Sequence, residues 1–345
     1  MNSYWQLTKD QQRLILEQAS ERALLPAQAI EKDLWVSTLL QLVFTLPIAQ
    51  KLIFKGGTSL SKVWNLIERF SEDIDLAIDR SVFNMEGDLT KKEIKKLRKA
   101  SSLYIRETFC PMLQEAVDRY GLKQLCHIEA EADGVGDATY PEPRKVIVYY
   151  DSALHTPIPY LRPMVQLEIG ARSLIEPHSP AHINSIIEEN LPSIQTSIVS
   201  PIIQTSIAEK TFLEKAFLLH ELFSVEDNHI ETIRKSRHLY DLYQMMHKGI
   251  AQKAIADSAL WESIRHHRSL FTSIRGIDYD ADIRQNMNLV PQSDMLDIWR
   301  KDYQDMCETM IYGAKPSFEE LVHSMQSLSQ SFKDSTCSLS NTNNR

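Results

Sequence analysis

The chain has 345 residues, of which 43% are hydrophobic and 24% are charged, and its formal net charge at pH 7 is −8. These proportions are ordinary for a globular protein with an ample hydrophobic interior. The negative balance excludes nucleic-acid binding by attraction over the whole surface. The most apolar long stretch, residues 36–49, is too short to span a bilayer and predicts a buried helix.

The N-terminus and the cysteines indicate a cytoplasmic protein without membrane association. The first residues, Met1 to Gln6, have neither a basic start nor an apolar core, so no signal peptide is expected. The cysteines show no C-x-x-C spacing and no paired arrangement, which is typical of free thiols in a reducing compartment. They are Cys110, Cys126, Cys307 and Cys337.

The first 49 residues predict a helical segment. Candidate helices cover residues 11–23 and 27–45, on either side of Pro26. A core is expected to begin at Leu52 with a strand, a helix and a second strand.

A double glycine at the end of the first strand predicts an anion site. Gly56 and Gly57 allow positive φ and the close approach of a ligand. Thr58 or Ser59 is expected to cap the following helix, whose backbone N–H groups and dipole favour an anion over the glycines. Apolar residues then repeat at helical spacing: Leu60, Val63, Trp64 and Ile67.

Two aspartates mark the second strand. Asp73 and Asp75 alternate with Ile74 and Leu76, so a strand presents both carboxylates on one face. Adjacent carboxylates repel unless a cation joins them, and hard oxygen ligands favour Mg²⁺ or Mn²⁺.

Each of these features taken alone has a plain structural explanation, the glycines as a turn and the aspartates as a solvated strand face. The two in this order, one helix apart, favour a phosphate cradle beside a metal-binding pair. The stretch is not a Walker A loop, because no glycine precedes Lys62.

A basic helix is predicted from Thr90 to about Tyr120. It is a candidate surface for RNA phosphates on an otherwise acidic protein. A solvated helix face and an acidic protein partner are the alternatives. The candidate RNA-binding residues are Lys91, Lys92, Lys95, Lys96 and Lys99, with Arg98 and Arg106 nearby.

Three strands are predicted after this helix, over residues 126–132, 145–150 and 164–169. On the last of them, Gln166 and Glu168 share one face. Pairing of that strand beside the aspartate strand would bring Glu168 to the metal-binding pair. Competing acids are Glu129 and Glu131, and a purely structural role would pair Glu168 with Arg172 or Arg162.

Helical periodicity returns from about residue 183. Lys215 lies on an otherwise apolar helical face, and a buried lysine needs an anion such as a nucleotide phosphate, Glu214 or Asp241. Arg237 and His238 are weaker candidates for phosphate contact. Residues 327–345, rich in Ser, Asn, Thr and Gln, predict a disordered tail.

These segments together resemble the AbiEii/AbiGii-type toxin nucleotidyltransferases. The segments FKGGTSLSK and RFSEDIDLAI of this chain are similar to the first motif of that family. The resemblance covers roughly residues 30–250. One departure is Phe212-Leu213, where the family has an aromatic second residue. Three further segments follow in the family's order: YLRPMVQLEIGARS (160–173), TFLEKAFLLH (211–220) and SRHLYDLY (236–243).

The resemblance implies an α+β fold, with the small mixed sheet of a polymerase-β-like nucleotidyltransferase core flanked by helices. It implies an N-terminal helical segment (1–49), the core (50–175), a helical C-terminal region that completes the active site (176–326) and the tail (327–345).

The resemblance also implies residue roles. Asp73, Asp75 and Glu168 are expected to hold Mg²⁺ or Mn²⁺, Lys215 to contact the triphosphate, and Asp241 to act near the acceptor or the nucleotide, or to orient Lys215. The nucleotide is expected at Gly56, Gly57, Thr58, Ser59, Lys62 and Lys215.

The implied function is that of a growth-inhibiting toxin. It would transfer nucleotides from NTP to an RNA such as the tRNA 3′ end, with release of pyrophosphate, and a cognate antitoxin protein would counter it. Two alternatives remain open: transfer to a protein hydroxyl, and a catalytically silent nucleotide-binding module.

Overall fold

The computed structural model of the chain describes residues 3–71, 73–136, 139–154, 161–224 and 233–342, with the side chains of 336–342 left out. The chain forms two compact units, described separately below. The first unit consists of residues 1–63 and 70–206, and the second of residues 64–69 and 207–345.

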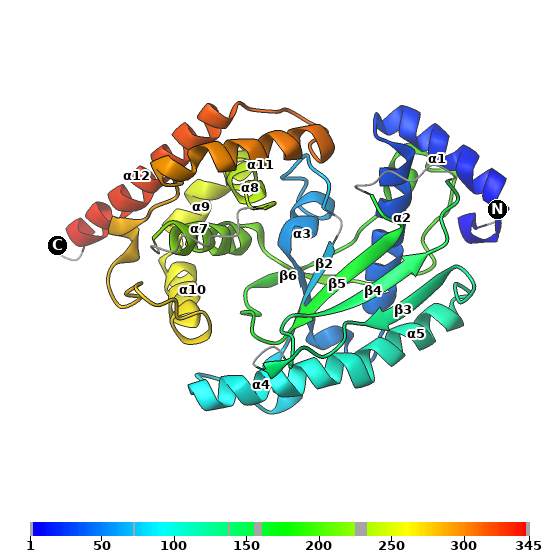
Figure 1. Cartoon of the computed structure of the whole chain (residues 1–345), viewed down its shortest axis with the longest axis horizontal. Helices are drawn as coiled ribbons and strands as arrows, with labels where there is room; N and C mark the ends of the chain where they lie inside the picture. The colour runs from blue at the N-terminus through cyan, green and yellow to red at the C-terminus, as the bar shows by residue number, and fades with distance from the viewer. Residues whose placement is uncertain (1–2, 72, 137–138, 155–160, 225–232, 343–345) are drawn as a thin grey trace. The chain divides into compact units, whose positions relative to one another are not determined.

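A mixed seven-stranded sheet forms the centre of the first unit (Figure 1), with the strand order β3-β4-β5-β2-β1-β7-β6. β2 pairs with β5 and β1 with β7 in parallel, and the other neighbours are antiparallel. This arrangement confirms the predicted α+β class. The strands are β1 (Leu52–Lys55), β2 (Asp73–Ile78), β3 (Cys126–Ala130), β4 (Arg144–Tyr150), β5 (Met164–Gly170), β6 (His178–Ala181) and β7 (Ile203–Ser206).

Five of these strands confirm the sequence prediction, whereas β6 and β7 were not predicted. Each of the two has only four residues, and β6 contains Pro180, which is tolerated because β6 is an edge strand. These two strands extend the sheet beyond β1. The first unit therefore continues to residue 206, past the expected core boundary at 175.

Helices cover the sheet of the first unit. The predicted N-terminal helices are confirmed, and the predicted basic helix is present as α4 and α5 joined by a π-helical turn over Ile105–Phe109. The helices are α1 (Lys9–Ala23), α2 (Ala27–Val43), α3 (Gly56–Lys62), α4 (Lys91–Tyr104), α5 (Cys110–Arg119) and α6 (Ile186–Asn190).

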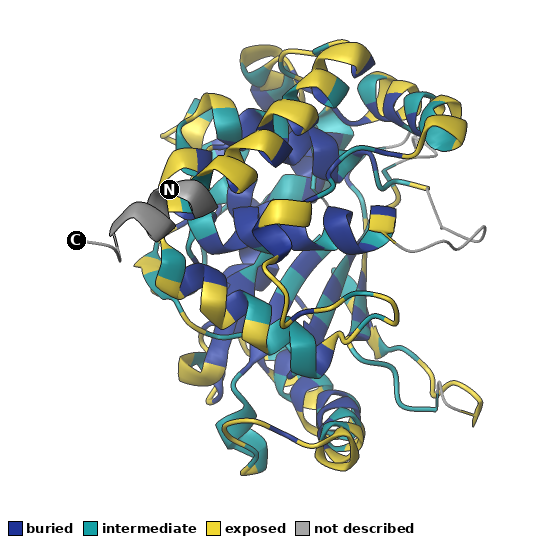
Figure 2. Ribbon diagram, turned by 90° about the vertical axis from the view of Figure 1, so that its left-hand side faces the viewer, coloured by how far each residue is buried: buried dark blue, intermediate teal, exposed yellow. Residues whose placement is uncertain are grey.

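One face of the sheet is apolar and the other is polar. On β5, Val165, Leu167 and Ile169 are fully buried, and α2 and α4 pack against this strand. Gln166 and Glu168 alternate with them and are only half-buried. The strands in Figure 2 show the same alternation between buried and intermediate residues. Packing of helices on one face thus leaves the other face to the polar side chains.

The helix after the double glycine is shorter than predicted. α3 begins directly at Gly56 with Lys55 as its N-cap, not at a cap formed by Thr58 or Ser59. It ends at Lys62, and Asn65 then adopts a left-handed conformation with φ of 51° that a helix does not continue through. Residues 64–69 consequently leave the first unit and belong to the second.

The second unit is helical, as predicted for the C-terminal region. The expected disordered tail is wrong for residues 327–342, which continue the last helix. Within it, buried Leu328 and Phe332 continue the helical spacing of buried Leu321 and Met325 despite the polar composition. The helices are α7 (Ala208–Ser224), α8 (Arg237–His247), α9 (Ile250–Ala256), α10 (Ser258–Phe271), α11 (Leu296–Thr309) and α12 (Phe318–Thr342), with a 3₁₀ turn at Ile283–Asn286. Over the described ranges, no helix combines the length and apolarity needed to cross a membrane.

Candidate active site

The strand β2 presents the two predicted aspartates on the polar face of the sheet. Asp73 and Asp75 are half-buried, whereas Ile74 and Leu76 between and beyond them are buried. The alternation follows from the two-residue repeat of a strand. Both carboxylates therefore remain within reach of a ligand while the strand itself is anchored in the core.

Gly56 lies directly against one of these carboxylates. A Cβ atom at this position would lie 1.9 Å from Asp75 Oδ2, and the glycine has a φ of +79°. Both the space and the conformation require glycine here. Lys55 is the register partner of Asp75, so β1 and β2 bring the double glycine and the aspartates together.

Glu168 joins the same face through strand register. β2 and β5 pair in parallel with Asp75 opposite Glu168, and Glu168 is in turn opposite Lys145 on β4. Its Oε1 accepts a hydrogen bond from Gln166 Nε2 at 2.9 Å and lies 3.8 Å from Lys145 Nζ. Gln166 and Lys145 are thus partners of Glu168 in the structure.

The competing acids on the neighbouring strand run lie elsewhere. Glu131 accepts a hydrogen bond from the backbone N–H of Lys145, and Glu129 is exposed, 3.8 Å from His127. A row of charges thus crosses four strands, in the order Lys55, Asp75, Glu168 and Lys145. With Asp73, three carboxylates face two lysines, and one negative charge is in excess.

This donor set has the chemistry of a divalent-cation site, because carboxylate oxygens are the ligands that Mg²⁺ and Mn²⁺ prefer. Among the residues that the structure describes, however, no three His, Cys, Asp or Glu side chains gather closely enough to hold a metal ion. Glu168 is engaged by Gln166 and Lys145 instead. Its predicted role as third ligand requires its carboxylate to leave these partners.

The hydroxyls and the lysine of the glycine motif are used within the fold. Thr58 Oγ1 donates to the carbonyl oxygen of Asp73 and can accept from Ser71 Oγ at 2.8 Å, and Ser59 Oγ donates to the carbonyl oxygen of Gly56 at 2.8 Å. Lys62 forms an ion pair with Asp33 and is largely buried. All three side chains therefore have partners within the protein in this conformation, and their contacts with a nucleotide stay a prediction.

A second charged cluster lies inside the helical unit. Asp241, on α8, is fully buried and accepts hydrogen bonds from Arg69 Nε at 2.7 Å and Arg69 Nη2 at 2.8 Å. Lys215 Nζ, on α7, lies 2.9 Å from Asp241 Oδ2. Of the partners predicted for Lys215 from the sequence, Asp241 forms an ion pair with it in the structure.

Burial and ion pairing fix the protonation states of this cluster. Burial opposes a charge on Asp241, but Arg69 and Lys215 hold the pKa of its carboxyl well below the ordinary value. Burial, followed by the charge of Lys215, lowers the pKa of His238 well below its ordinary value. The neutral imidazole can accept from Lys215 Nζ, which lies 3.3 Å from its Nδ1. Two cations share one carboxylate, so one positive charge is in excess.

Arg69 is the functional candidate that sequence reasoning missed. Its side chain is 2% exposed, and it pairs with Asp241, which lies 172 residues further along the chain. Its only sequence signal is its place at the start of the RFSEDIDLAI segment. No local pattern links it to Asp241.

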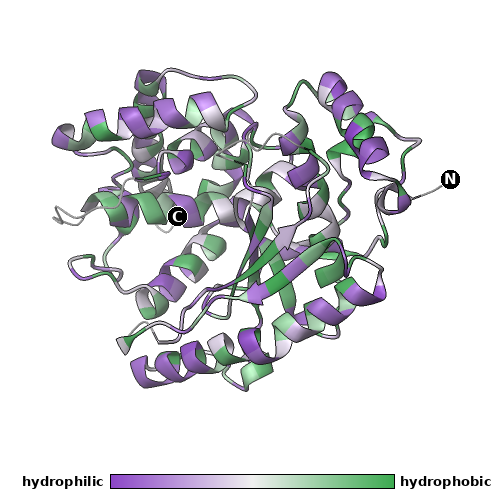
Figure 3. Cartoon of the chain, turned by 45° about the vertical axis from the view of Figure 1, so that its right-hand side comes forward, coloured by the Kyte–Doolittle hydropathy of each residue, from purple (hydrophilic) through white to green (hydrophobic). Residues whose placement is uncertain are grey.

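The basic surface on α4 is present as predicted. Figure 3 shows the start of this helix as strongly hydrophilic. A capping box between Thr90 and Glu93 fixes its first turn. All five candidate lysines are exposed: Lys91, Lys92, Lys95, Lys96 and Lys99.

Known proteins are similar to this chain in sequence pattern and in structure. The family model described as nucleotidyl transferase AbiEii toxin, type IV TA system, matches residues 39–324. MenT4, a nucleotidyltransferase toxin from Mycobacterium tuberculosis, is similar in structure at 14% identity, with 94% of this chain and 98% of that chain covered and a TM-score of 0.44. JHP933 from Helicobacter pylori is similar at 16% identity, with 92% and 97% covered and a TM-score of 0.43. No curated protein matches the chain.

The family model spans most of the chain and includes both charged clusters, the glycine motif and the aspartate strand. This match confirms the family inferred from the sequence motifs and the expectation of a nucleotidyltransferase with a nucleotide substrate and a cognate antitoxin. The chain belongs to the AbiEii family of nucleotidyltransferase toxins of type IV toxin–antitoxin systems.

Proposed function

We propose that this toxin transfers nucleotides from an NTP to an RNA acceptor such as the tRNA 3′ end, in a reaction that depends on a divalent metal ion. The observation that carries the proposal is the pair of half-buried carboxylates on β2, with Gly56 packed against Asp75. A strand that served structure alone would gain nothing from two adjacent like charges.

The carboxylate face is suited to hold a cation. Asp73 and Asp75 would be the principal ligands, and Glu168 the third after release from Lys145. A divalent ion bound there supplies charge neutralisation for the triphosphate and a lower pKa for an attacking hydroxyl. The excess negative charge of the face favours such an ion, and Gly56 keeps backbone and ligand close together.

The cluster in the helical unit is suited to bind an anion. Lys215 keeps a small exposed fraction, 10% of its side chain, while its positive charge shares Asp241 with Arg69. One carboxylate cannot neutralise both cations, and burial lowers the pKa of Lys215. We assign Lys215 to the triphosphate, where phosphate oxygens would complete its charge compensation. Asp241 then serves to hold Lys215 in place.

The exposed lysines of α4 support an RNA acceptor. A basic helix on a chain with a net charge of −8 concentrates phosphate attraction on one surface. Transfer to a protein hydroxyl needs no such surface. An RNA acceptor therefore explains one more feature of the chain than a protein acceptor does.

The experiment that tests the proposal is transfer of label from each α-³²P-NTP in turn to total cellular RNA, with and without Mg²⁺ or Mn²⁺. The wild type is compared with Asp73→Asn, Asp75→Asn and the control Glu129→Gln, an exposed carboxylate on the same sheet. Label in RNA of tRNA size, dependent on metal and on both aspartates but not on Glu129, is the expected result.

Other outcomes would overturn parts of the proposal. Label only in protein would replace the RNA acceptor with a protein hydroxyl. Transfer that persists in a chelator would overturn the metal dependence. If Lys92→Glu and Lys96→Glu leave RNA labelling and its salt dependence unchanged, the α4 surface has no role in acceptor binding.

A further inference from the structure

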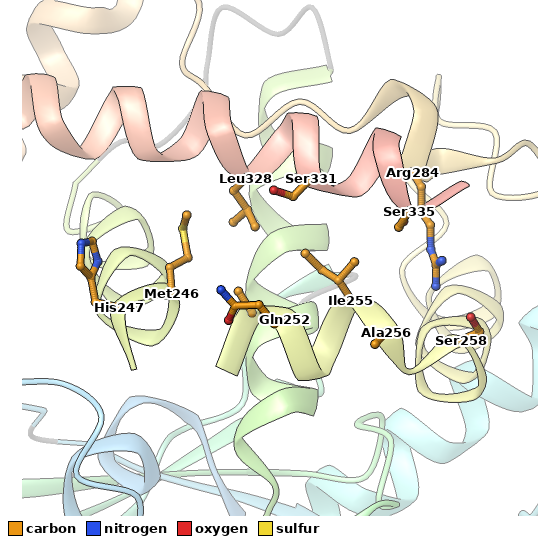
Figure 4. A pocket seen from close by; sticks show the side chains of 11 residues that line it. Met246, His247, Gln252, Ile255, Ala256, Ser258, Arg284, Leu328, Ser331 and Ser335 are labelled. Atoms are coloured by element: carbon orange, nitrogen blue, oxygen red, sulfur yellow. The ribbon is translucent and has the colours of Figure 1, made fainter. Parts of the chain in front are cut away.

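The helical unit contains a cavity apart from the cluster around Asp241. Its volume is about 680 Å³, within the range of small-molecule sites. Figure 4 shows it lined by side chains from α8, α9, α12 and the turn at 283–286. Apolar side chains form much of its wall, among them Met246, Ile255 and Leu328.

One charged side chain is buried in the wall of this cavity. Arg284 is only 4% exposed, and its Nε has no hydrogen-bond partner. Asp282 and Glu262 favour its positive charge electrostatically, but neither forms an ion pair or hydrogen bond with the guanidinium in the described part of the chain. Burial lowers the pKa of Arg284. An unpaired buried cation is costly and calls for an anion.

The guanidinium of Arg284 lies over an aromatic ring. Its Cζ lies 4.7 Å from the centroid of the Trp261 ring, and Trp261 is itself packed against Phe217 and Phe332. This cation–π contact fixes the plane of the guanidinium. An arginine held in this way presents a fixed fork of donors, the geometry that matches a carboxylate.

The two ends of the cavity differ in character. In Figure 4, Arg284 lies at the same end as the hydroxyls of Ser258 and Ser335, and Met246 lies toward the other end. The first end offers one cation and two hydroxyls. The remainder combines the hydrocarbon of Met246, Ile255 and Leu328 with the polar side chains of His247, Gln252 and Ser331. A phosphate dianion would find only one buried cation among the described lining residues, whereas a monoanion with an apolar chain would use both ends.

We propose that this cavity binds a small organic carboxylate with an apolar body, with the carboxylate on Arg284 and the hydrocarbon against Ile255 and Leu328. The site is separate from the transfer chemistry and does not depend on the proposed function. Its occupant compensates the charge that the fold leaves unpaired.

The test uses isothermal titration calorimetry of the full chain with sodium octanoate, 1-octanol and inorganic phosphate. We expect one octanoate to bind per chain, with octanol at least about tenfold weaker because it lacks the charge that Arg284 recognises. Arg284→Gln should weaken octanoate binding by at least about tenfold. Arg300→Gln is the matched control, because Arg300 also stacks on an aromatic ring, that of Phe318, but is already paired with Glu319 and Asp297.

A second variant keeps the proposal testable if Arg284→Gln does not fold. Ser331 is exposed and lines the cavity from α12, so Ser331→Trp should fill the space while Arg284 stays in place. It should weaken octanoate binding by at least about tenfold. Absence of octanoate binding to the wild type, equal affinity in Arg284→Gln, or phosphate binding as tight as octanoate would overturn the proposal.

Discussion

The carboxylate face of the sheet and the charged cluster of the helical unit solve opposite electrostatic problems. On the sheet, Asp73, Asp75 and Glu168 outnumber the lysines of the same face, and they are half-buried. In the helical unit, Arg69 and Lys215 outnumber Asp241, and all three are buried. The first set has a negative excess that suits a metal ion, and the second has a positive excess that suits a phosphate.

The difference in burial predicts that the carboxylates of the sheet serve function, whereas the charges around Asp241 also stabilise the fold. Half-exposed like charges on one strand and its neighbour repel each other, so they are expected to contribute little to folding. A buried carboxylate with three short charged contacts is necessary for folding, because its removal leaves buried cations unpaired. Substitutions in the two sets should therefore have opposite consequences.

The largest effect is expected on activity, from Asp73→Asn or Asp75→Asn. Each should reduce nucleotide transfer at least about 10³-fold, equivalent to about 4 kcal/mol, because it removes a metal ligand where charge compensation is most needed. Stability should stay within about 1 kcal/mol of the wild type or rise, since a repulsive charge is lost. Label transfer and urea unfolding measure the two quantities.

Glu129→Gln is the control for this pair and should change neither quantity. The functional role of the sheet carboxylates would be contradicted if Asp75→Asn lowered the free energy of unfolding by several kcal/mol, or if it left nucleotide transfer intact.

The next effect is on stability, from Asp241→Asn. Loss of this charge leaves Arg69 and Lys215 buried without their carboxylate, and the free energy of unfolding should fall by about 3–5 kcal/mol. Lys215→Met is the matched variant, because Asp241 keeps its two hydrogen bonds from Arg69. It should cost less stability than Asp241→Asn and still abolish most transfer.

Urea unfolding measures the stability of both variants, and label transfer measures their activity. Equal destabilisation by the two substitutions would show that Lys215 is a structural partner of Asp241 and nothing more. Normal transfer by a folded Lys215→Met variant would remove Lys215 from the triphosphate.

The features of this arrangement that the sequence predicts are those determined by residues close together in the chain. The glycine motif, the aspartate alternation on β2 and the strands β3 to β5 depend on turn chemistry and on a two-residue repeat, which neighbouring residues determine. The family motifs place Lys215 and Asp241 among the candidates for the same reason, since each motif is short and continuous. The amino-acid sequence alone is therefore enough to predict these features.

The missed features depend on contacts between distant parts of the chain. Arg69 reaches Asp241 only because residues 64–69 join the helical unit. Lys145 meets Glu168 through strand register, which a single strand does not encode. The composition of the end of α12, in which serine and other small polar residues dominate, predicts disorder, whereas the buried side chains of Leu328 and Phe332 anchor the helix there.

A smaller effect is expected at Gly56, where stability and activity can be separated by a matched pair of glycines. Gly56→Ala and Gly249→Ala both place alanine at a positive φ, +79° and +76°, but only the first meets an obstacle, Asp75 Oδ2. Each should cost about 1–2 kcal/mol of stability. Transfer should fall at least about tenfold in Gly56→Ala alone, because the Asp75 carboxylate must move.

Thermal unfolding and label transfer on the two variants measure this difference. Equal activities would show that the position of the Asp75 carboxylate against Gly56 is unimportant for transfer, and would weaken the assignment of the sheet face to catalysis.

A last effect, which depends on pH, concerns Glu142, a buried carboxylate of the first unit that tests whether burial alone or pairing decides the sign of a pKa shift. Burial raises its pKa from 4.5 to about 7, although the backbone N–H of Ala171, which donates to its Oε1 at 2.6 Å, and the charge of Arg172 favour the ionised form. Asp241 is buried more completely, yet its two cations shift its pKa in the opposite direction.

Between pH 4.5 and 7 the folded state of the protein therefore holds a proton on Glu142 that the unfolded state has released, and stability falls as the pH rises through this range. Glu142→Gln removes this dependence, so the stability of the wild type relative to the variant should decline by about 1–3 kcal/mol from pH 4.5 to pH 7 and then level off. Urea unfolding at a series of pH values measures the decline, with Glu129→Gln as the exposed control. Parallel pH profiles for wild type and Glu142→Gln would mean that Glu142 is ionised in the folded state, and that weak partners suffice to compensate a buried carboxylate in this fold.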